Sequence, residues 1–265
     1  MNSLNRQTIG TPLILLVANG PWVDEKVLRR ICAMRSVQSL RLEEGSLPRA
    51  LAFGRSYVAT PYFGFLDDDD EYLPDALRVR LQPLEDDSTA AVCSTDGYHF
   101  IDGRDHIRGV ISPETQQDPL RGLLGANWLA SCSGLFRSDR VEESFFDGVT
   151  KYFEWTLLAY KLAASRRIVL LNTPTYRLYE SSDSLSRSEA YLLAEPGFIE
   201  KIIALDLPQD VREALAKRVS RAHHAISSYH LRRGDIQSAW IAHLRSLGQP
   251  GGLRYLTYTL KLLLR

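Results

Sequence analysis

The stretch Pro61-Tyr62-Phe63-Gly64-Phe65-Leu66-Asp67-Asp68-Asp69-Asp70-Glu71 decides the fold prediction, because it places an apolar run directly before four adjacent aspartates. A short apolar run bounded by polar residues is typical of a buried strand. Pro74 and the leucines at 77, 81 and 84 follow, which indicates the start of a helix. The carboxylates are therefore expected in a loop between a strand and a helix.

Other apolar runs extend this pattern into an α/β sheet. Leu13 to Val17 predicts a strand buried on both faces, as in a parallel sheet, and Arg167 to Leu171 predicts a late strand. Two further strands are expected at 90–94 and 99–101, joined by a turn at 95–97. Strands alternating with helices predict a mixed, mostly parallel sheet flanked by helices.

From Tyr191 onward the periodicity is helical, and Gly234-Asp235 is expected to separate two helices. We therefore predict a sheet domain over residues 1–190 and a helical C-terminal region over 191–265.

Composition excludes several classes of protein. The chain has 32 basic and 32 acidic side chains, whereas a protein that binds nucleic acid usually carries a basic excess. Three widely spaced cysteines form neither a disulfide framework nor a zinc motif. No segment has the length and apolarity of a membrane span or a signal peptide, so the expected location is the cytoplasm.

The acidic run suggests a site for a divalent cation. In an extended segment alternate side chains share a face, so Asp67 and Asp69 are expected to converge while Asp68 and Asp70 point elsewhere. Two carboxylates on one face suit Mg²⁺ or Mn²⁺, with substrate phosphates as further ligands. The alternative is a solvated loop whose charges stabilise the N-terminus of the following helix.

The segment from Tyr62 to Pro74 closely resembles the Asp-X-Asp region of GT-A-type, family-2-like inverting glycosyltransferases. The resemblance includes Leu13 to Asn19, which looks like the second strand of that family, and Tyr152-Phe153-Glu154-Trp155, which looks like its acidic helix start. It continues through Arg167 to Arg177 and Ser181 to Ser186, and covers roughly residues 7 to 190.

This resemblance implies a GT-A fold and transfer of a sugar, with inversion, from a nucleotide-diphosphate donor to a hydroxyl acceptor. It implies Mn²⁺ or Mg²⁺ held by Asp69 and Asp67, with Asp67 and Asp68 contacting the nucleotide sugar. Glu154 matches the general base. A weaker match places Trp128 and Trp155 on the acceptor side, although tryptophan is more often a packing residue.

Three departures from the family pattern stand out. The match to the second strand of the family starts only about a dozen residues in, so we expect that the first strand is shortened or missing, or that the chain begins at an internal start. The aspartate that contacts the nucleotide base is replaced by Asn19, which keeps hydrogen-bonding capacity without charge. The general base is glutamate in place of aspartate, and Tyr176-Arg177 stands where some relatives carry a histidine.

Two other functions stay open at this point. A glycosyltransferase-like binding or scaffold subunit without catalysis would account for the missing strand and for Asn19. A nucleotidyltransferase is a further alternative, against which stands the lack of a glycine-rich phosphate loop before the acids.

The acceptor of a glycosyltransferase of this kind would be a saccharide or a lipid-linked molecule in surface polysaccharide or glycoconjugate synthesis. The C-terminal segment 253–265 combines leucines, tyrosines and three cations, as in a segment that lies on the inner face of a membrane. The alternative is that these leucines pack on the protein or against a second copy.

Overall fold

The computed structural model describes residues 1–179 and 188–264, so the predicted match at Ser181 to Ser186 lies outside the described residues. The chain divides into two compact units, Met1–Glu180 and Ser181–Arg265. Each is described by itself below.

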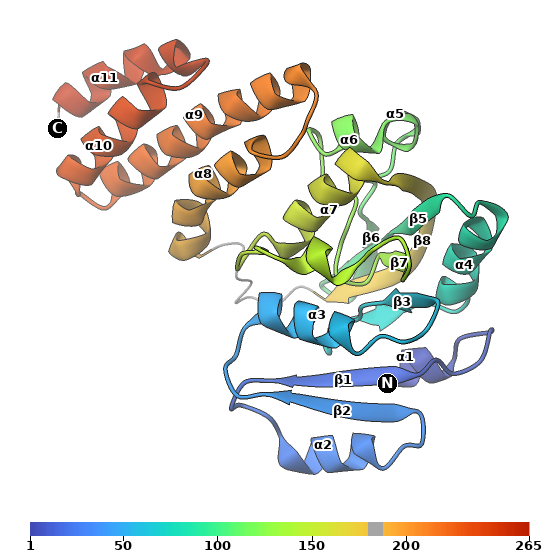
Figure 1. Ribbon diagram of the computed structural model, residues 1–265. Coiled ribbons are helices and arrows are strands. Elements are labelled where there is room, and N and C mark those ends of the chain that lie inside the picture. The colour runs from blue at the N-terminus through green and yellow to red at the C-terminus, as the bar shows by residue number, and fades with distance from the viewer. Residues whose placement is uncertain (180–187, 265) are drawn as a thin grey trace. The chain divides into compact units, whose positions relative to one another are not determined.

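The first unit alternates strands with helices (Figure 1). Its strands are β1 (Ile14–Asn19), β2 (Val37–Leu42), β3 (Tyr62–Gly64), β4 (Glu71–Tyr72), β5 (Ala90–Ile101), β6 (Arg104–Ile107), β7 (Gly134–Arg137) and β8 (Arg167–Tyr179). Its helices are α1 (Asn2–Asn5), α2 (Glu25–Cys32), α3 (Leu47–Ser56), α4 (Ala76–Asp86), α5 (Pro113–Gln117), α6 (Pro119–Gly122), the 3₁₀ turn η1 (Glu143–Phe146) and α7 (Glu154–Ser165).

The strands form two sheets. A six-stranded sheet has the order β3-β7-β5-β8-β4, with β6 paired to β5, and β1 and β2 form a separate parallel pair. The mixed α/β class is confirmed, but the expectation of mostly parallel pairing is wrong for the larger sheet. There β5 and β8 are parallel, whereas β3/β7, β5/β7, β4/β8 and β5/β6 are antiparallel. Antiparallel neighbours need no helical crossover to return the chain to the starting edge.

The β1-β2 pair is less buried than its sequence predicted. Leu13 is 77% exposed, and Ile14 to Val17 are only half-buried. β2 is the one strand that pairs with β1 among the described residues, so the other edge of β1 has no strand beside it. The expectation of a shortened or missing first strand stays a prediction.

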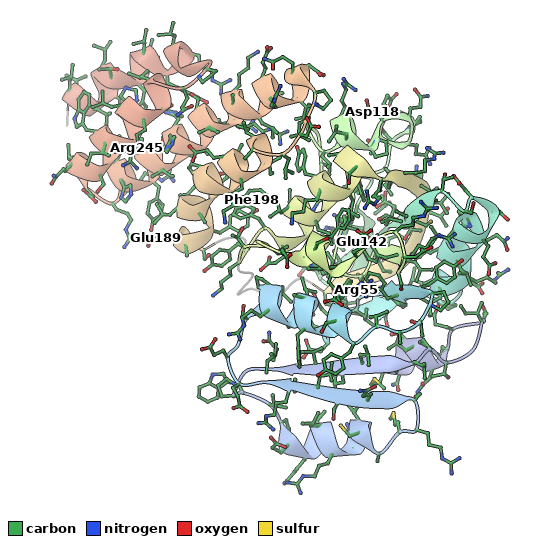
Figure 2. The ribbon with its side chains drawn as sticks, viewed as in Figure 1. Arg55, Asp118, Glu142, Glu189, Phe198 and Arg245 are labelled. Carbon is green, nitrogen blue, oxygen red and sulfur yellow. The ribbon has the colours of Figure 1, made fainter. Side chains whose placement is uncertain are left out.

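Helix α3 connects the strand pair to the rest of the unit. A Cβ at Gly54 would lie 3.3 Å from a methyl group of Val17, so glycine allows α3 to approach β1 closely. On the same helix the buried guanidinium of Arg55 donates to the carbonyls of Val141 (3.0 Å) and Ser138 (2.9 Å) (Figure 2). These bonds hold α3 against the segment that follows β7.

β5 corrects the prediction of two strands joined by a turn at 95–97, because it runs unbroken through that point. The Asp96 carboxylate is fully buried and accepts hydrogen bonds from Gly97 N (2.9 Å) and Val110 N (3.1 Å), at a register shift against β8. Such a bulge absorbs turn-forming residues within a strand. The turn lies instead at Asp102-Gly103, whose φ values of 50° and 78° suit a two-residue hairpin.

The polar segment after Asp102 forms β6 and the short helices α5 and α6. Ser112 and Asp118 cap these helices by accepting hydrogen bonds from Thr115 N and Arg121 N. Side-chain caps of this kind let short polar segments form helical turns.

The second unit is helical, as predicted. It contains α8 (Glu189–Ile203), α9 (Gln209–Arg232), α10 (Ile236–Leu247), the 3₁₀ turn η3 (Gly252–Tyr255) and α11 (Leu256–Leu263). The predicted break is present, with Gly234 at φ 80° and Asp235 capping α10 through Ser238 N (3.0 Å). None of the helices in the described ranges has the length and apolarity needed to cross a membrane.

Gly97 supplies a test of the continuous β5 strand. A Cβ at this position would lie 2.4 Å from the Tyr176 ring, so Gly97→Ala is expected to lower the free energy of unfolding by roughly 1–3 kcal/mol, as overpacking does. Gly45→Ala is the matched control, since its Cβ would meet atoms only at 3.7 Å and beyond. Urea unfolding measures both, and equal stability of the two variants would contradict this packing.

Candidate active site

The acidic run forms a tight turn between β3 and β4. Asp70 N donates to the Asp67 carbonyl (3.3 Å), and the Tyr72 hydroxyl closes the loop by donating to the Phe65 carbonyl (2.7 Å). Burial raises the pKa of Tyr72 to about 12, so this hydroxyl keeps its proton at neutral pH. One carboxylate oxygen each from Asp67, Asp69 and Asp70 then lies within 4.8 Å of the others.

This turn confirms one expectation about geometry and corrects another. Asp67 and Asp69 converge, but Asp70 joins them although alternation placed it on the opposite face. The reason is that alternation applies to an extended strand, whereas a turn brings residues i and i+3 together. Asp68 is exposed and lies outside this cluster.

Asp70 is fixed by groups that sequence analysis did not identify. One of its oxygens accepts from Tyr179 N at the end of β8 (3.2 Å), and the other lies 3.3 Å from Ser131 Oγ and 3.8 Å from Cys132 Sγ. These partners are 61 to 109 residues away along the chain, so no local sequence signal could have found them.

Burial and crowding make it unfavourable to ionise all the carboxylates of the cluster. The pKa of Asp70 is raised to about 7, first by burial and then by the charges of Asp69 and Asp67, against the hydrogen bond from Tyr179 N. Burial also raises the pKa of Asp67, with contributions from Asp69, Asp68 and Glu154. A bound cation would remove this cost.

Buried Arg80 links the turn to the larger sheet. Its guanidinium lies 4.7 Å from the centre of the Tyr72 ring and donates through Nε to the hydroxyls of Thr95 (3.2 Å) and Thr175 (3.1 Å). The same Tyr72 closes the turn, so Arg80 holds the loop on the central strands β5 and β8.

Glu154 lies near this cluster, at the first position of α7. It is 6% exposed and its carboxylate accepts a hydrogen bond from Tyr152 N (3.0 Å), and Tyr152 has a positive φ of 81°. Burial raises the pKa of Glu154, while hydrogen bonds from the backbone of Glu154 and Tyr152, and then the charge of Lys151, oppose the shift. Since Glu154 contributes to the shift of Asp67, the predicted base and the acidic turn lie in one electrostatic environment.

The two tryptophans differ in what they can contact. Half-buried Trp155 packs edge to face on Phe65, with ring centres 5.3 Å apart, which places the start of α7 beside the acidic turn. Trp128 is fully buried and its indole N–H donates to the Pro119 carbonyl (2.9 Å). Trp128 is therefore a packing residue, and its expected contact with an acceptor is wrong.

Asn19 ends β1 and is exposed, as a base-binding residue requires. Its amide oxygen accepts from Ser46 N at the start of α3 (2.8 Å), so this half of the amide is already used. Within residues 1–179 and 188–264 its amide nitrogen makes no hydrogen bond. Among the described residues, no hydrogen bond or ion pair links Asn19 to the acidic turn.

The position where relatives carry a histidine is occupied by an ion-pair network. Arg177 bonds Asp105 through two nitrogens at 2.6 Å each and also pairs with Glu71, which accepts from the Tyr179 hydroxyl (3.1 Å). Arg177 thus joins β4, β6 and β8 beside the acidic turn and offers no ligand to a cation.

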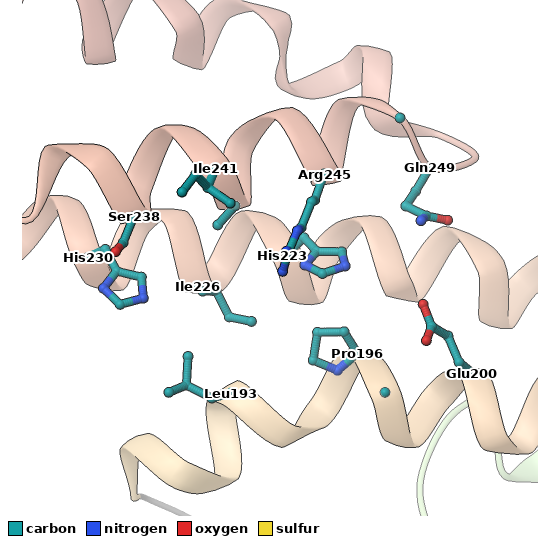
Figure 3. Close-up of a pocket in the computed structure, with 13 residues that line it drawn as sticks. Leu193, Pro196, Glu200, His223, Ile226, His230, Ser238, Ile241, Arg245 and Gln249 are labelled. Atoms are coloured by element: carbon teal, nitrogen blue, oxygen red, sulfur yellow. The ribbon is translucent and has the colours of Figure 1, made fainter.

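A separate groove of about 700 Å³ lies in the second unit, between α8, α9 and α10 (Figure 3). Its walls combine Leu193, Pro196 and Ile226 with His223 and Arg245. No group of three possible metal-ligating side chains occurs there within the described residues. The acidic turn with Glu154 is therefore the stronger candidate for chemistry.

Comparison with known proteins identifies the family. Residues 2–139, just over half of the chain, match the family described as Glycosyl transferase family 2. The crystal structure of S. aureus TarS 1-349 in complex with UDP-GlcNAc aligns with a TM-score of 0.60 at 12% identity, over 93% of this chain and 85% of that chain.

A longer S. aureus TarS structure aligns with a TM-score of 0.57 at 16% identity, over 83% of this chain and 40% of that one. This chain thus spans less than half the length of that longer structure. No curated protein matches the sequence. The family match and the shared fold agree with the expectation from sequence: this chain belongs to glycosyltransferase family 2 and has the GT-A fold.

Proposed function

We propose that this protein transfers a sugar from a nucleotide-diphosphate donor to a hydroxyl acceptor, with inversion at the anomeric carbon and with a requirement for Mn²⁺ or Mg²⁺. The observation that carries the proposal is the convergence of three carboxylate oxygens within 4.8 Å, with buried Glu154 in the same electrostatic environment. Family membership supports the nucleotide-sugar donor.

The residues fit a hard divalent cation. The donor set is all oxygen, Asp69 is exposed, and burial with neighbouring charge raises the pKa values of Asp67 and Asp70, so a cation would stabilise their ionised forms. Asp69 and Asp67 are the proposed ligands, with Asp70 as a third. A cation bound there would neutralise the charge that develops on the departing diphosphate.

Glu154 is the proposed general base. As the acceptor oxygen bonds to the anomeric carbon, the bond from that carbon to the donor phosphate breaks and the hydroxyl proton passes to the carboxylate of Glu154. Burial raises the pKa of this carboxyl and so makes it a stronger base than an exposed glutamate. Half-buried Trp155 is the proposed acceptor-side contact.

Asn19 and Asp68 are proposed to bind the donor. The amide nitrogen of Asn19 would donate to a carbonyl oxygen of the nucleotide base, since its amide oxygen is held by Ser46. Exposed Asp68 would contact the sugar or ribose hydroxyls. UDP-GlcNAc is the first donor to test, because the similar TarS structure was solved with it.

The proposed acceptor is a saccharide or a lipid-linked molecule in surface polysaccharide or glycoconjugate synthesis. With a lipid-linked acceptor the enzyme would work in the cytoplasm at the inner face of the membrane.

Asp69→Ala tests the cation site. Removing one of the three proposed carboxylate ligands is expected to weaken Mn²⁺ binding roughly a hundredfold, because one unit of negative charge is lost from a partly buried site. Calorimetry with Mn²⁺ alone measures this, with Asp68→Ala as the control. Asp68 lies outside the cluster and its loss should weaken binding much less. Equal effects of the two changes would refute the assignment.

Glu154→Gln separates catalysis from binding. The amide keeps the shape and can still accept the hydrogen bond from Tyr152 N, but it does not take up a proton, so kcat should fall by about 10²- to 10⁴-fold while the donor Kd changes little. Transfer assays and UDP-GlcNAc titration with Mn²⁺ give both numbers. A wild-type protein that binds the donor but shows no turnover with any acceptor would favour the scaffold function.

The raised pKa of Asp70 predicts how cation affinity depends on pH. The cation binds the ionised carboxylate, so affinity should rise as pH increases through about 7, by roughly tenfold between pH 6 and pH 8. Asp70→Asn removes this proton while preserving an acceptor for Tyr179 N. It should therefore bind Mn²⁺ more weakly with a flatter pH profile, and an unchanged profile would assign the proton to another group.

A further inference from the structure

The last helix of the second unit is apolar on two faces. One face of α11 packs inward, where Leu262 is 2% exposed in a cluster with Leu231 and Ala239, and Thr259 bonds His243 (2.8 Å). The face turned away from this cluster carries leucines at helical spacing. These are Leu253 (72% exposed), Leu256 (51%), Leu260 (63%), Leu263 (66%) and Leu264 (86%).

The charged side chains in the sequence around these leucines are all basic. No aspartate or glutamate occurs from Ile236 to Arg265, a stretch that contains Arg245, Arg254, Lys261 and Arg265. Arg254 and Lys261 are exposed and lie over the rings of Tyr255 (4.7 Å) and Tyr258 (5.6 Å). We call the five leucines together with Arg254 and Lys261 the C-terminal surface (α11, red in Figure 1).

We infer that the C-terminal surface binds the interfacial region of a membrane rich in anionic lipids, with its leucines among the acyl chains and its cations at the headgroups. Helices that combine an apolar face with flanking lysine and arginine bind lipid surfaces in this way. At eight residues α11 is too short to span a bilayer, so it would lie in the interface.

Charge argues for lipid over a second copy of the chain. A two-fold interface sets a surface against itself, so the C-terminal surface would face Arg254 and Lys261 with the same two cations and no carboxylate from residues 236–265. An anionic bilayer supplies the opposite charge instead. Inside the unit, burial lowers the pKa of His224, and the charges of His243, Arg254 and Lys261 lower it further.

This inference rests on the second unit alone and bears on the proposed function only through the lipid-linked acceptor. Vesicle binding is measured without donor, acceptor or metal, so failure of the glycosyltransferase proposal would leave the result unchanged. Conversely, loss of vesicle binding would not alter Mn²⁺ or donor affinity in solution.

The test is co-sedimentation of the full chain with vesicles. One set contains phosphatidylcholine alone, and the other contains phosphatidylcholine and phosphatidylglycerol in equal amounts. Each basic side chain at the surface contributes about fivefold to anionic binding, so we expect affinity about 25-fold higher for the mixed vesicles from Arg254 and Lys261 together. High salt should remove this difference but not all binding.

Two variants separate the contributions, and one is a matched control. Leu260→Gln combined with Leu263→Gln should weaken binding to the mixed vesicles at least about tenfold, without lowering the melting temperature, since both side chains are exposed. Arg254→Glu combined with Lys261→Glu should abolish the preference for anionic vesicles. Leu13→Gln, at an equally exposed leucine of the first unit, should leave binding unchanged.

Three outcomes would overturn the inference. The wild type could fail to bind either kind of vesicle, or it could bind equally with and without the leucines of the C-terminal surface. Sedimentation equilibrium could instead show a dimer that the leucine variant dissociates, in which case the C-terminal surface is an interface between two copies.

Discussion

The site depends on one electrostatic constraint, which is that three carboxylates share a partly buried turn. Their oxygens lie within 4.8 Å of one another, and this proximity is unfavourable unless a proton or a cation intervenes. Burial first, and then the charges of the neighbouring carboxylates, raise the pKa values of Asp67 and Asp70. Much of the first unit holds this turn in place, so folding maintains a negative cluster that a ligand could relieve.

The turn is supported by hydrogen bonds from neutral groups and by Arg80, which contacts Tyr72 and not the carboxylates. Tyr179 N, at the end of β8, and Ser131 Oγ, in the turn before β7, both bond Asp70. The Tyr72 hydroxyl donates to the Phe65 carbonyl and so closes the turn. Arg80 lies over the Tyr72 ring and makes its hydrogen bonds to threonine hydroxyls. Because no arginine or lysine forms an ion pair with Asp67, Asp69 or Asp70 among the described residues, the cluster keeps its capacity for a cation.

The two units present different physical chemistry. The first has acidic side chains collected in a turn and a buried glutamate near them, which suits a charged, phosphate-bearing donor together with a metal. The second has an outward apolar face with cations and no acids over its last thirty residues, which suits an anionic, apolar surface. The acidic turn is not needed for the proposed membrane binding, and the C-terminal surface is not needed for the proposed sugar transfer.

The sequence by itself determined the family, the α/β class, the helical C-terminal region and the acidic run, because these are local patterns of apolar spacing and charge. It misplaced the turn at 95–97, since the buried Asp96 and the Gly97-Tyr176 contact depend on β8, some eighty residues away. Only the tertiary structure drew Asp70 into the cluster, through Tyr179 and Ser131, and only it buried Trp128. Those outcomes follow from hydrogen bonds and packing between distant strands, which no local pattern encodes.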